Sequence, residues 1–384
     1  MSAKRIGVFT GSRSEYGLLV PVMRAVDADA NLDLRVISGD PSPGQPEFPI
    51  AVHVPIIRSD ETPGSTPRAI GDGVLGLTSA LDDLHLDALV IYGDRFEAFA
   101  AMIAATQRGL AVAHLEGGDL TQGGTLDDVV RHAMSKLAHL HFPTNAAAAD
   151  RLRTMGEEDW RITTAGFPPI DLIEAGDFAT PDEVTDALGL RVDQPLVLFT
   201  QHPISTAPQT AKPEIAACMT ALSQARQNLG AQIILTHPNG DVGSDAIIHA
   251  LDAFAVTHPD TVLRKTLGRR LYHGVLNVCG QGVGVCVGNS SSGLKETPAF
   301  KCPTVDIGPR QTGRLRGENV LHVGCEAGAV FQAIQTALTD HSFRARVKAA
   351  KNPYGQGKAG STIARVLAST DLTDPSLVQK QTVL

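Results

Sequence analysis

The sequence predicts an α/β protein built from two doubly wound, Rossmann-like domains, and three observations support this prediction. Short apolar runs rich in β-branched residues recur along the 384 residues, and each is followed by a turn and a helix-like stretch. Such runs are typical of strands buried on both faces, and their alternation with helices is typical of parallel sheets. The length suits about two or three domains, at roughly 100–200 residues per domain. A composition with 43% hydrophobic and 19% charged residues is that of a globular protein with a large core.

The apolar runs form two sets, and we expect each set to build one parallel sheet. The first set comprises residues 6–10, 34–37, 88–92, 112–116 and 162–165. The second set comprises residues 196–200, 233–236, 283–287, 305–307 and 320–323. The boundary lies near residues 176–195, where Thr180, Pro181 and Glu183 predict a helix start with an N-cap and a capping box. The prolines of segment 40–49 predict a surface loop, because proline fits neither a central strand nor a helix interior.

Composition and charge exclude several classes of partner. The net charge of −8 gives no attraction to nucleic acid or to an anionic membrane, so we expect neither as a partner. No apolar run approaches the roughly 20 residues that span a bilayer, and the run after Lys4 and Arg5 is too short for a signal peptide. The expected location is therefore the cytoplasm. The cysteines form an odd set without a ligand pattern, which predicts reduced thiols and no catalytic metal: Cys218, Cys279, Cys286, Cys302 and Cys325.

Polar residues follow five of the predicted strands. Ligands of open parallel sheets bind outside the carboxyl ends of the strands. The polar segments at these ends are residues 11–16, 93–95, 116–119, 201–203 and 288–293. The sequence therefore predicts a functional site built from these segments, between the two halves.

The glycine- and serine-rich segment 288–293 follows a predicted strand and precedes a helix. Such a turn directs backbone N–H groups and hydroxyls at an anion, and Arg310, Arg314 and Arg316 follow the next strand with guanidinium groups that suit phosphate. The segment matches neither the P-loop nor the dinucleotide fingerprint, so ATP and NAD lack their signatures and we expect no cofactor. A capped helix without a ligand and a solvated basic loop are the alternatives.

Carboxylates gather after the strands of the first half, and they are candidate general acids and bases. They are Asp94, Glu116, Asp119, Asp127 and Asp128. Thr125 to Asp128 also fits a capping box, so Asp127 and Asp128 have the alternative of serving only the start of a helix. The predicted buried stripe of that helix is Val129, Ala133, Met134 and Leu137. After a strand of the second half, His202 is a candidate proton carrier, with a structural histidine as the alternative.

Taken in order, six motifs resemble those of the hydrolysing UDP-N-acetylglucosamine 2-epimerases, the enzymes that open sialic acid biosynthesis. These motifs are residues 93–95, 114–119, 127–133, 201–203, 288–293 and 310–314. The likeness covers about residues 5–365. It implies a GT-B-like fold, with two Rossmann-type domains around a central cleft. The implied domains are residues 1–177, with acid/base groups, and 178–365, with the nucleotide, while 366–384 packs back on the first.

The resemblance also implies the reaction, in which UDP-N-acetylglucosamine and water give N-acetylmannosamine and UDP. The C2 proton of the sugar is not adjacent to a carbonyl, so its removal alone is prohibitive. Loss of UDP from C1 together with that proton gives a glycal, which needs a base near C2 and a cationic, N–H-rich cradle for the diphosphate. Water then adds across the double bond, with protonation of C2 from the opposite face. Homodimers or homotetramers are common in this family.

By resemblance, particular residues of this chain take particular roles. Asp94 and Glu116 would transfer protons at the sugar, one of Asp127 and Asp128 would orient a partner or activate water, and His202 would assist the leaving phosphate or close the site. The implied diphosphate contacts are Arg13, Ser290, Ser291, Gly293 and Arg310. Glu296 would accept the ribose diol, and Leu267 and Gly268 would present backbone to uracil.

Asp119 stands where many relatives have glutamate, and segment 39–65 is compressed, which leaves the sugar's C4 and C6 substituents open. The alternatives are a hydrolysing 2-epimerase of a 2,4-diacetamido-trideoxy UDP-sugar, a non-hydrolysing 2-epimerase, a GT-B glycosyltransferase, and a nucleotide-sugar sensor without turnover.

Overall fold

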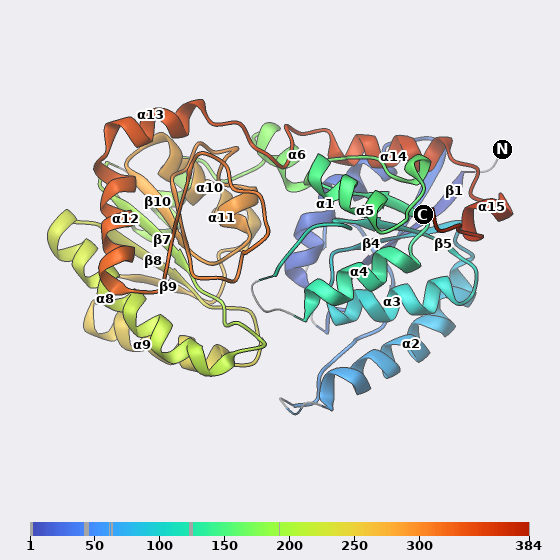
Figure 1. Ribbon diagram of the computed structural model, residues 1–384, viewed down its shortest axis with the longest axis horizontal. Helices are drawn as coiled ribbons and strands as arrows, with labels where there is room; N and C mark the ends of the chain where they lie inside the picture. The colour runs from blue at the N-terminus through green and yellow to red at the C-terminus, as the bar shows by residue number, and fades with distance from the viewer. Residues whose placement is uncertain are drawn as a thin grey trace. The chain divides into compact units, whose positions relative to one another are not determined.

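The computed structural model describes residues 3–41, 46–60, 62, 64–122, 126–191 and 193–383. The chain forms two compact units (Figure 1). Unit 1 comprises Met1–Leu120, Asp127–Leu172 and Tyr354–Leu384, and unit 2 comprises Thr121–Leu126 and Ile173–Pro353. Each unit contains one parallel six-stranded sheet.

Unit 1 has the strand order β3-β2-β1-β4-β5-β6. Its strands are β1 (Lys4–Thr10), β2 (Leu32–Ser38), β3 (Ile50–His53), β4 (Ala88–Tyr92), β5 (Ala111–Leu115) and β6 (Leu140–Phe142). Its helices are α1 (Arg13–Asp27), α2 (Ser65–Leu84), α3 (Phe96–Thr106), α4 (Asp127–Leu137), α5 (Ala146–Thr154), α14 (Ala359–Ser369) and α15 (Pro375–Val378). Helix α6 (Pro169–Glu174) crosses from unit 1 into unit 2.

Unit 2 has the strand order β12-β11-β10-β7-β8-β9. Its strands are β7 (Leu196–Thr200), β8 (Gln232–Thr236), β9 (Val262–Arg264), β10 (Gly284–Gly288), β11 (Thr304–Ile307) and β12 (Val320–Val323). Its helices are α7 (Pro181–Leu188), α8 (Ala211–Leu229), α9 (Ser244–Thr257), α10 (Gly268–Gln281), α11 (Ser292–Lys295), α12 (Ala327–Thr339) and α13 (His341–Ala349).

Helices cover both faces of each sheet, which explains why the central strands are almost entirely apolar. In unit 1, α1 and α14 pack on one face, while α2, α3 and α4 pack on the other. In unit 2, α8, α9 and α12 pack on one face, and α7 and α10 pack on the other. The prediction of two doubly wound α/β domains is confirmed.

The prediction of a strand at residues 162–165 is wrong. Only Ile162 pairs there, in an isolated bridge with His141, and the sixth strand of unit 1 is β6. This strand has three residues with a histidine at its centre, so no apolar run marks it. The edge strands β3 and β9 also escaped prediction, because both are short and only partly buried.

The predicted buried stripe of α4 is wrong for two of its residues. Val129 and Ala133 are exposed, whereas Arg131, Met134 and Ser135 are buried. A charged residue occupies the buried face, so counting apolar positions misplaces the stripe. The capping box predicted from Thr125 lies outside the described residues. Of segment 40–49, the described residues form no helix or strand, and residues 42–45 lie outside the description.

The start of α7 has the predicted geometry. Thr180 accepts a hydrogen bond from the backbone of Glu183, and Glu183 accepts one from the backbone of Thr180. The C-terminal segment belongs to unit 1, where the carboxylate of Asp171 accepts the first N–H groups of α14, from Ala359 and Gly360. The boundaries of the two functional domains, at residues 177 and 365, stay predictions.

Candidate functional site

Each sheet reverses its strand order once, and the predicted polar segments follow the strands at these switch points. In unit 1 the order reverses between β1 and β4, which lead into residues 11–13 and 93–95. In unit 2 it reverses between β7 and β10, which lead into Gln201-His202 and into residues 289–291. Ligands of doubly wound sheets bind at such points.

The guanidinium of Arg131 organises the acids of unit 1. Its side chain is 0% exposed and projects from α4. It forms an ion pair with Asp94, which follows β4, and its Nη1 lies 3.2 Å from Oδ1 of Asp128. The same Nη1 donates to the backbone oxygen of Asp119 at 3.0 Å. One buried cation therefore holds two carboxylates and the segment after β5 in fixed positions.

Glu116 directly follows β5 in a strained backbone conformation. Its φ is 64°, in the left-handed region that non-glycine residues rarely adopt, and the residue is buried. Its N–H donates to the carbonyl of Phe142 at 3.2 Å. At Gly118, φ is 77° and an added Cβ would clash with the carbonyl oxygen of Ala148, so this turn requires glycine. Strain of this kind is common at functional sites, where surrounding contacts maintain it.

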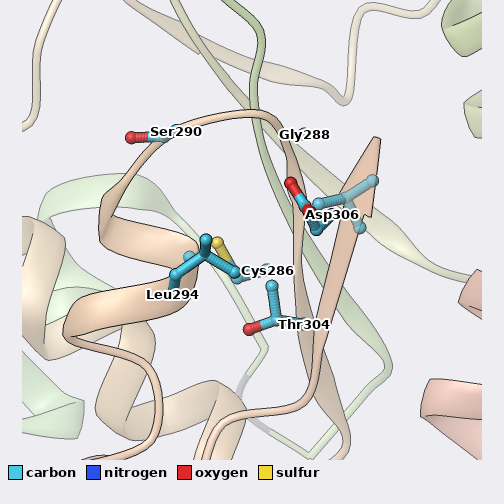
Figure 2. A pocket seen from close by; sticks show the side chains of 8 residues that line it. Cys286, Gly288, Ser290, Leu294, Thr304 and Asp306 are labelled. Atoms are coloured by element: carbon cyan, nitrogen blue, oxygen red, sulfur yellow. The ribbon is translucent and has the colours of Figure 1, made fainter. Parts of the chain in front are cut away.

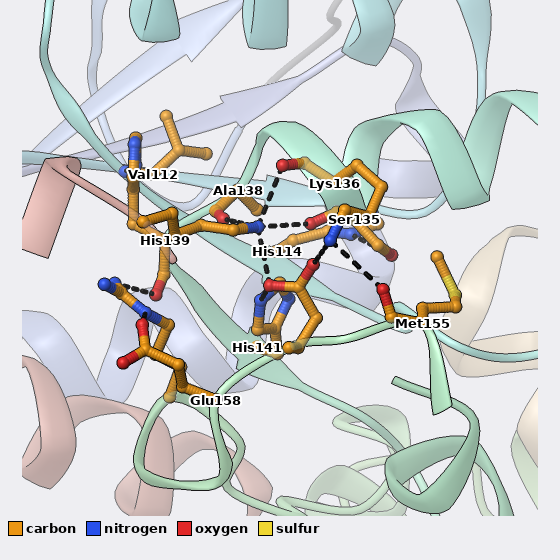
Figure 3. Close-up of polar contacts among 12 residues, drawn as sticks. Val112, His114, Ser135, Lys136, Ala138, His139, His141, Met155 and Glu158 are labelled. Carbon is orange, nitrogen blue, oxygen red and sulfur yellow. Dashed lines mark hydrogen bonds and ion pairs between the residues drawn. The ribbon is translucent and has the colours of Figure 1, made fainter. Parts of the chain in front are cut away.

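His114 joins the turn that contains Asp94 to helix α4. Its Nε2 donates to the carbonyl of Gly93 at 2.7 Å, and the hydroxyl of Ser135 lies 3.2 Å from its Nδ1 (Figure 3). Burial lowers the pKa of His114 to about 4, so the imidazole is neutral at neutral pH. A neutral ring with Nε2–H matches both contacts, which makes His114 a support for the Asp94 turn rather than a metal ligand.

Asp127 and Asp128 begin α4, and the contacts distinguish them. Asp128 contacts Arg131 and lies 3.9 Å from Nε2 of His132. Asp127 is half-buried one position earlier. Arg13 is the first residue of α1 and is exposed. It belongs to unit 1, which also contains the acids.

In unit 2, the side chain of Asn289 fixes the turn after β10. Its Oδ1 accepts from the backbone N–H of His202 at 2.7 Å, and its Nδ2 donates to the His202 carbonyl at 2.8 Å. The backbone carbonyl of Asn289 in turn accepts from Arg310 at 3.0 Å and from Gln311 at 2.7 Å. At Gly288, φ is 131° and a Cβ would clash with the Thr200 carbonyl, so the strands approach closely there. The exits of β7, β10 and β11 are thus held together.

His202 is held at one ring nitrogen by Asn239. Its Nδ1 lies 3.0 Å from Oδ1 of Asn239 and 3.2 Å from the backbone nitrogen of that residue. Burial and the positive charge of Arg310 lower the pKa of His202 to about 4. The imidazole is therefore neutral at neutral pH. It can donate one hydrogen bond and accept another, but it carries no positive charge.

The remaining predicted nucleotide contacts lie in unit 2 as well. Ser290 lies on the turn after β10, beside a small pocket that Thr304 and Asp306 of β11 also line (Figure 2). The carboxylate of Glu296 accepts from the Ser292 hydroxyl at 2.6 Å. Ser291 and Gly293 flank the start of α11, and Leu267 and Gly268 lie at the start of α10.

Burial opposes the ionisation of Glu296, but His273, 3.3 Å away, and the Ser292 hydroxyl outweigh it and lower the pKa of Glu296. Glu296 is therefore an ionised carboxylate, as an acceptor of hydroxyl groups should be.

The structure brings together the predicted residues within each unit and adds several that the sequence reasoning missed. Asp94, Asp119 and Asp128 share Arg131 in unit 1, whereas Arg310 and His202 contact Asn289 in unit 2. The missed residues are Arg131, His114, Asn289, Asn239 and Gln311. Four of them lie inside the six motifs, and this position could have marked them as candidate site residues. Asn239 lies in none of these motifs.

No group of three or more metal-ligating side chains with suitable geometry occurs among the described residues. Within the same part of the chain, no helix combines the length and apolar character that crossing a membrane requires.

Comparisons with known proteins agree with the motifs. Residues 30–368 match the family model described as UDP-N-acetylglucosamine 2-epimerase. The chain is 31% identical to the hydrolysing UDP-N,N'-diacetylbacillosamine 2-epimerase of Legionella pneumophila, over 96% of this chain and 97% of that protein. It is 30% identical to the UDP-N-acetylglucosamine 2-epimerase of Neisseria meningitidis serogroup B, over 89% of each.

The fold has a counterpart among solved structures. The crystal structure of UDP-GlcNAc 2-epimerase from Neisseria meningitidis bound to UDP-GlcNAc superposes with a TM-score of 0.79. The superposition covers 96% of this chain and 100% of that one, at 17% identity. This likeness concerns the fold.

Proposed function

Because this chain belongs to the UDP-N-acetylglucosamine 2-epimerase family, we propose that it is a hydrolysing 2-epimerase of a UDP-2-acetamido sugar. The proposed substrate is UDP-N-acetylglucosamine, and the proposed products are N-acetylmannosamine and UDP. The observation that carries this proposal is the acid cluster held by the buried Arg131, since proton transfer at carbon requires carboxylates in defined positions.

In the first step, a carboxylate takes the proton from C2 while the bond between C1 and the diphosphate oxygen breaks. The electron pair of the C2–H bond forms the C1–C2 double bond of 2-acetamidoglucal, and UDP leaves with the pair of the C1–O bond. We assign this proton transfer to Asp94 or Glu116. The ion pair with Arg131 holds the carboxylate of Asp94 in a fixed position.

In the second step, water adds to the glycal. Its oxygen bonds to C1, and C2 receives a proton from the face opposite the one that lost it, which gives the manno configuration. We assign activation of the water to Asp127 and orientation of the cluster to Asp128, because Asp128 contacts Arg131. The second of Asp94 and Glu116 would supply the proton.

Unit 2 offers groups that suit the departing UDP. The turn after β10 presents Ser290 and Ser291, and Arg310 is bonded to the backbone of that turn. Guanidinium and hydroxyl donors stabilise the charge that develops on a leaving diphosphate. The ionised carboxylate of Glu296 suits the ribose hydroxyls.

A second candidate substrate is the UDP-2,4-diacetamido-2,4,6-trideoxy sugar, and the similarity to the Legionella pneumophila protein favours it. An NMR time course in D₂O with each UDP-sugar tests both substrates and the reaction. We expect free UDP and a manno-configured free sugar with deuterium at C2. Deuterium in a UDP-linked manno sugar would instead indicate a non-hydrolysing epimerase, and binding without turnover would contradict the proposal.

A further inference from the structure

A pair of buried carboxyl groups lies at the switch point of unit 1, apart from the acids already described. Glu15 belongs to the first turn of α1, after β1, and Glu97 belongs to the first turn of α3, after β4. Glu15 is 3% exposed and Glu97 is 5% exposed. Both lie around Gly11, where an added Cβ would stand 2.7 Å from Cβ of Glu97 and 3.2 Å from Oε2 of Glu15. Both side chains therefore pack against Gly11.

The cations near this pair are too few to neutralise two carboxylates. Arg95 donates to both oxygens of Glu97, at 3.2 and 3.0 Å, which pairs one cation with one anion. Oε2 of Glu15 accepts the N–H of Gly11 at 3.1 Å, and its Oε1 is buried without a hydrogen-bond partner. Among the described residues, the charged groups that face Glu15 are Glu97 and Arg95, while Arg13 on its own helix is exposed. An ionised Glu15 would leave a net negative charge in the protein interior, which is costly.

We infer that Glu15 is a positioning residue that keeps its proton in the working enzyme. As a neutral acid beside Glu97 and its partner Arg95, it holds the turn after β1 and the turn after β4 in place at the switch point. These turns contain Arg13 and Asp94, so a positioning role of Glu15 extends the proposed function. It rests on that function only for the kinetic test. The pH at which Glu15 ionises then sets the upper pH limit of activity.

The simpler explanation is that Glu15 only completes a capping box, and Glu183 in unit 2 shows what such a residue looks like. Glu183 occupies the same third helical position, is exposed, and accepts from the backbone of Thr180 at 2.7 Å. That bond lowers the pKa of Glu183. For Glu15, burial and then the negative charge of Glu97 raise the pKa to about 8, against the weaker opposing effects of Arg95 and the Gly11 N–H. At the same helical position, the pKa of the glutamate is therefore raised in unit 1 and lowered in unit 2.

The direction of the pH effect on stability follows from this raised pKa. In the unfolded chain Glu15 ionises near pH 4.5, and in the folded chain near pH 8. Between these values only the folded chain holds the proton, so the contribution to stability is complete below about pH 4.5 and is lost as pH rises through about 8. Glu15→Gln has the same shape, donates a hydrogen bond and never ionises, so it should remove this loss.

The first test measures the thermal unfolding midpoint by circular dichroism from pH 5 to pH 9, without substrate. The midpoint of Glu15→Gln minus that of wild type should grow by about 4 °C between pH 5 and pH 8. The matched control Glu183→Gln should give a constant difference over this range. Glu97→Gln should weaken the pH dependence as well, because it removes the like charge and leaves Arg95 to Glu15. Parallel curves for wild type and Glu15→Gln would overturn the inference.

The second test follows kcat/KM for UDP release from pH 6 to pH 10. Wild type should fall about tenfold between pH 7 and pH 9, in proportion to the protonated fraction, while Glu15→Gln stays level and keeps the wild-type rate at pH 7. Loss of activity in Glu15→Gln at pH 7, with normal stability, would show that Glu15 itself transfers a proton and would contradict a positioning role. If wild type turns over neither UDP-sugar, the proposed function fails, and the thermal test still decides whether Glu15 keeps its proton.

Discussion

The two sheets share one topology, and the residues after their central strands differ in kind. In unit 1 the exits of β4 and β5 carry carboxylates around a buried guanidinium, with a strained glutamate at residue 116. In unit 2 the exits of β7 and β10 carry amides, hydroxyls and a neutral histidine, fixed by Asn289. A doubly wound sheet therefore supplies the location of a site, and the residues after its strands supply the chemistry.

The difference suggests a division of labour, in which unit 1 supplies proton transfer and unit 2 supplies nucleotide binding. Mutations can test the two roles separately. Carboxylates held in fixed positions suit proton transfer, whereas amide, hydroxyl and guanidinium donors suit a nucleotide diphosphate. Substitutions in unit 1 should then lower turnover and leave nucleotide binding intact, and substitutions in unit 2 should do the reverse.

The largest effect is expected from Asp94→Asn and Glu116→Gln. Each removes a carboxylate that we propose transfers a proton, while keeping its shape, and in Asp94→Asn the new amide oxygen can still accept a hydrogen bond from Arg131. We expect kcat to fall by about 10²–10⁴-fold, with UDP affinity within about twofold of wild type. UDP release by chromatography and UDP binding by calorimetry measure the two quantities. Asp150→Asn, at an exposed carboxylate of the same unit, is the control. Normal turnover in Asp94→Asn would remove its assignment as a base.

Arg131→Met should affect both stability and turnover. The substitution leaves Asp94 and Asp128 without their shared cation, and breaking a buried ion pair costs about 3–5 kcal/mol. Urea denaturation followed by circular dichroism gives the free energy of unfolding. Arg153→Met, at an exposed arginine that pairs with Asp150 and Asp159, should have a much smaller effect. Equal effects of the two substitutions would contradict the organising role of Arg131.

Arg131 also illustrates how far sequence reasoning reaches. Short apolar runs predicted most central strands, and motif order predicted the acids, because both signals are local. The buried face of α4 was predicted wrongly, because a charged residue occupies it and its partners Asp94 and Asp119 are distant in the sequence. Contacts of this kind arise from the tertiary structure. For the same reason, the sequence did not predict that Asn239 lies beside His202 or that Glu15 lies near Glu97.

A smaller effect, confined to unit 1, is expected from Lys380→Met. Lys380 donates to the carbonyls of Ser135, Lys136 and Ala138 at the end of α4, and its Nζ lies 2.6 Å from Glu157. The loss of these contacts should reduce the free energy of unfolding of unit 1 by about 2 kcal/mol. Helix α4 begins with Asp127, so the C-terminal segment supports the acid-bearing helix from its far end.

The pH dependence of this effect has a definite sign. Burial opposes the ionisation of Glu157, but hydrogen bonds from His141, Lys136 and Lys380 outweigh it and lower its pKa to about 2. The stability that Glu157 contributes is therefore complete above about pH 4.5 and is lost as pH falls towards 2. The difference in the free energy of unfolding between wild type and Lys380→Met, measured by denaturation, should therefore shrink as pH falls over this range. An exposed lysine, Lys351→Met, should show no such trend.

In unit 2, Arg310→Gln should weaken UDP binding about tenfold, the loss expected for one charge-assisted hydrogen bond. Burial and, to a smaller extent, Arg310 lower the pKa of His202 to about 4, so the substitution should raise that pKa while burial still keeps it below its ordinary value of 6.5. Calorimetry measures the affinity, and NMR titration of the imidazole ring protons measures the pKa. Arg264→Gln, at an exposed arginine of β9, is the control. A fall in kcat with unchanged UDP affinity would contradict the division of labour.

The smallest effect is expected from Thr180→Ala, which tests the scaffold of unit 2 apart from its site. The Thr180 hydroxyl accepts the N–H of Glu183 at 3.2 Å, and α7 packs its Val184 and Leu188 into the core beneath the sheet. Loss of an N-cap hydrogen bond costs about 1 kcal/mol, and Thr180→Ser should restore it because serine keeps the hydroxyl. The cap lies at the start of α7, whereas the residues proposed to bind the nucleotide follow β7 and β10, so UDP affinity and turnover should stay at wild-type values. A change in UDP affinity comparable to that of Arg310→Gln would mean that the helix ends of unit 2 influence the site, and the scaffold and the site could then no longer be treated as separate.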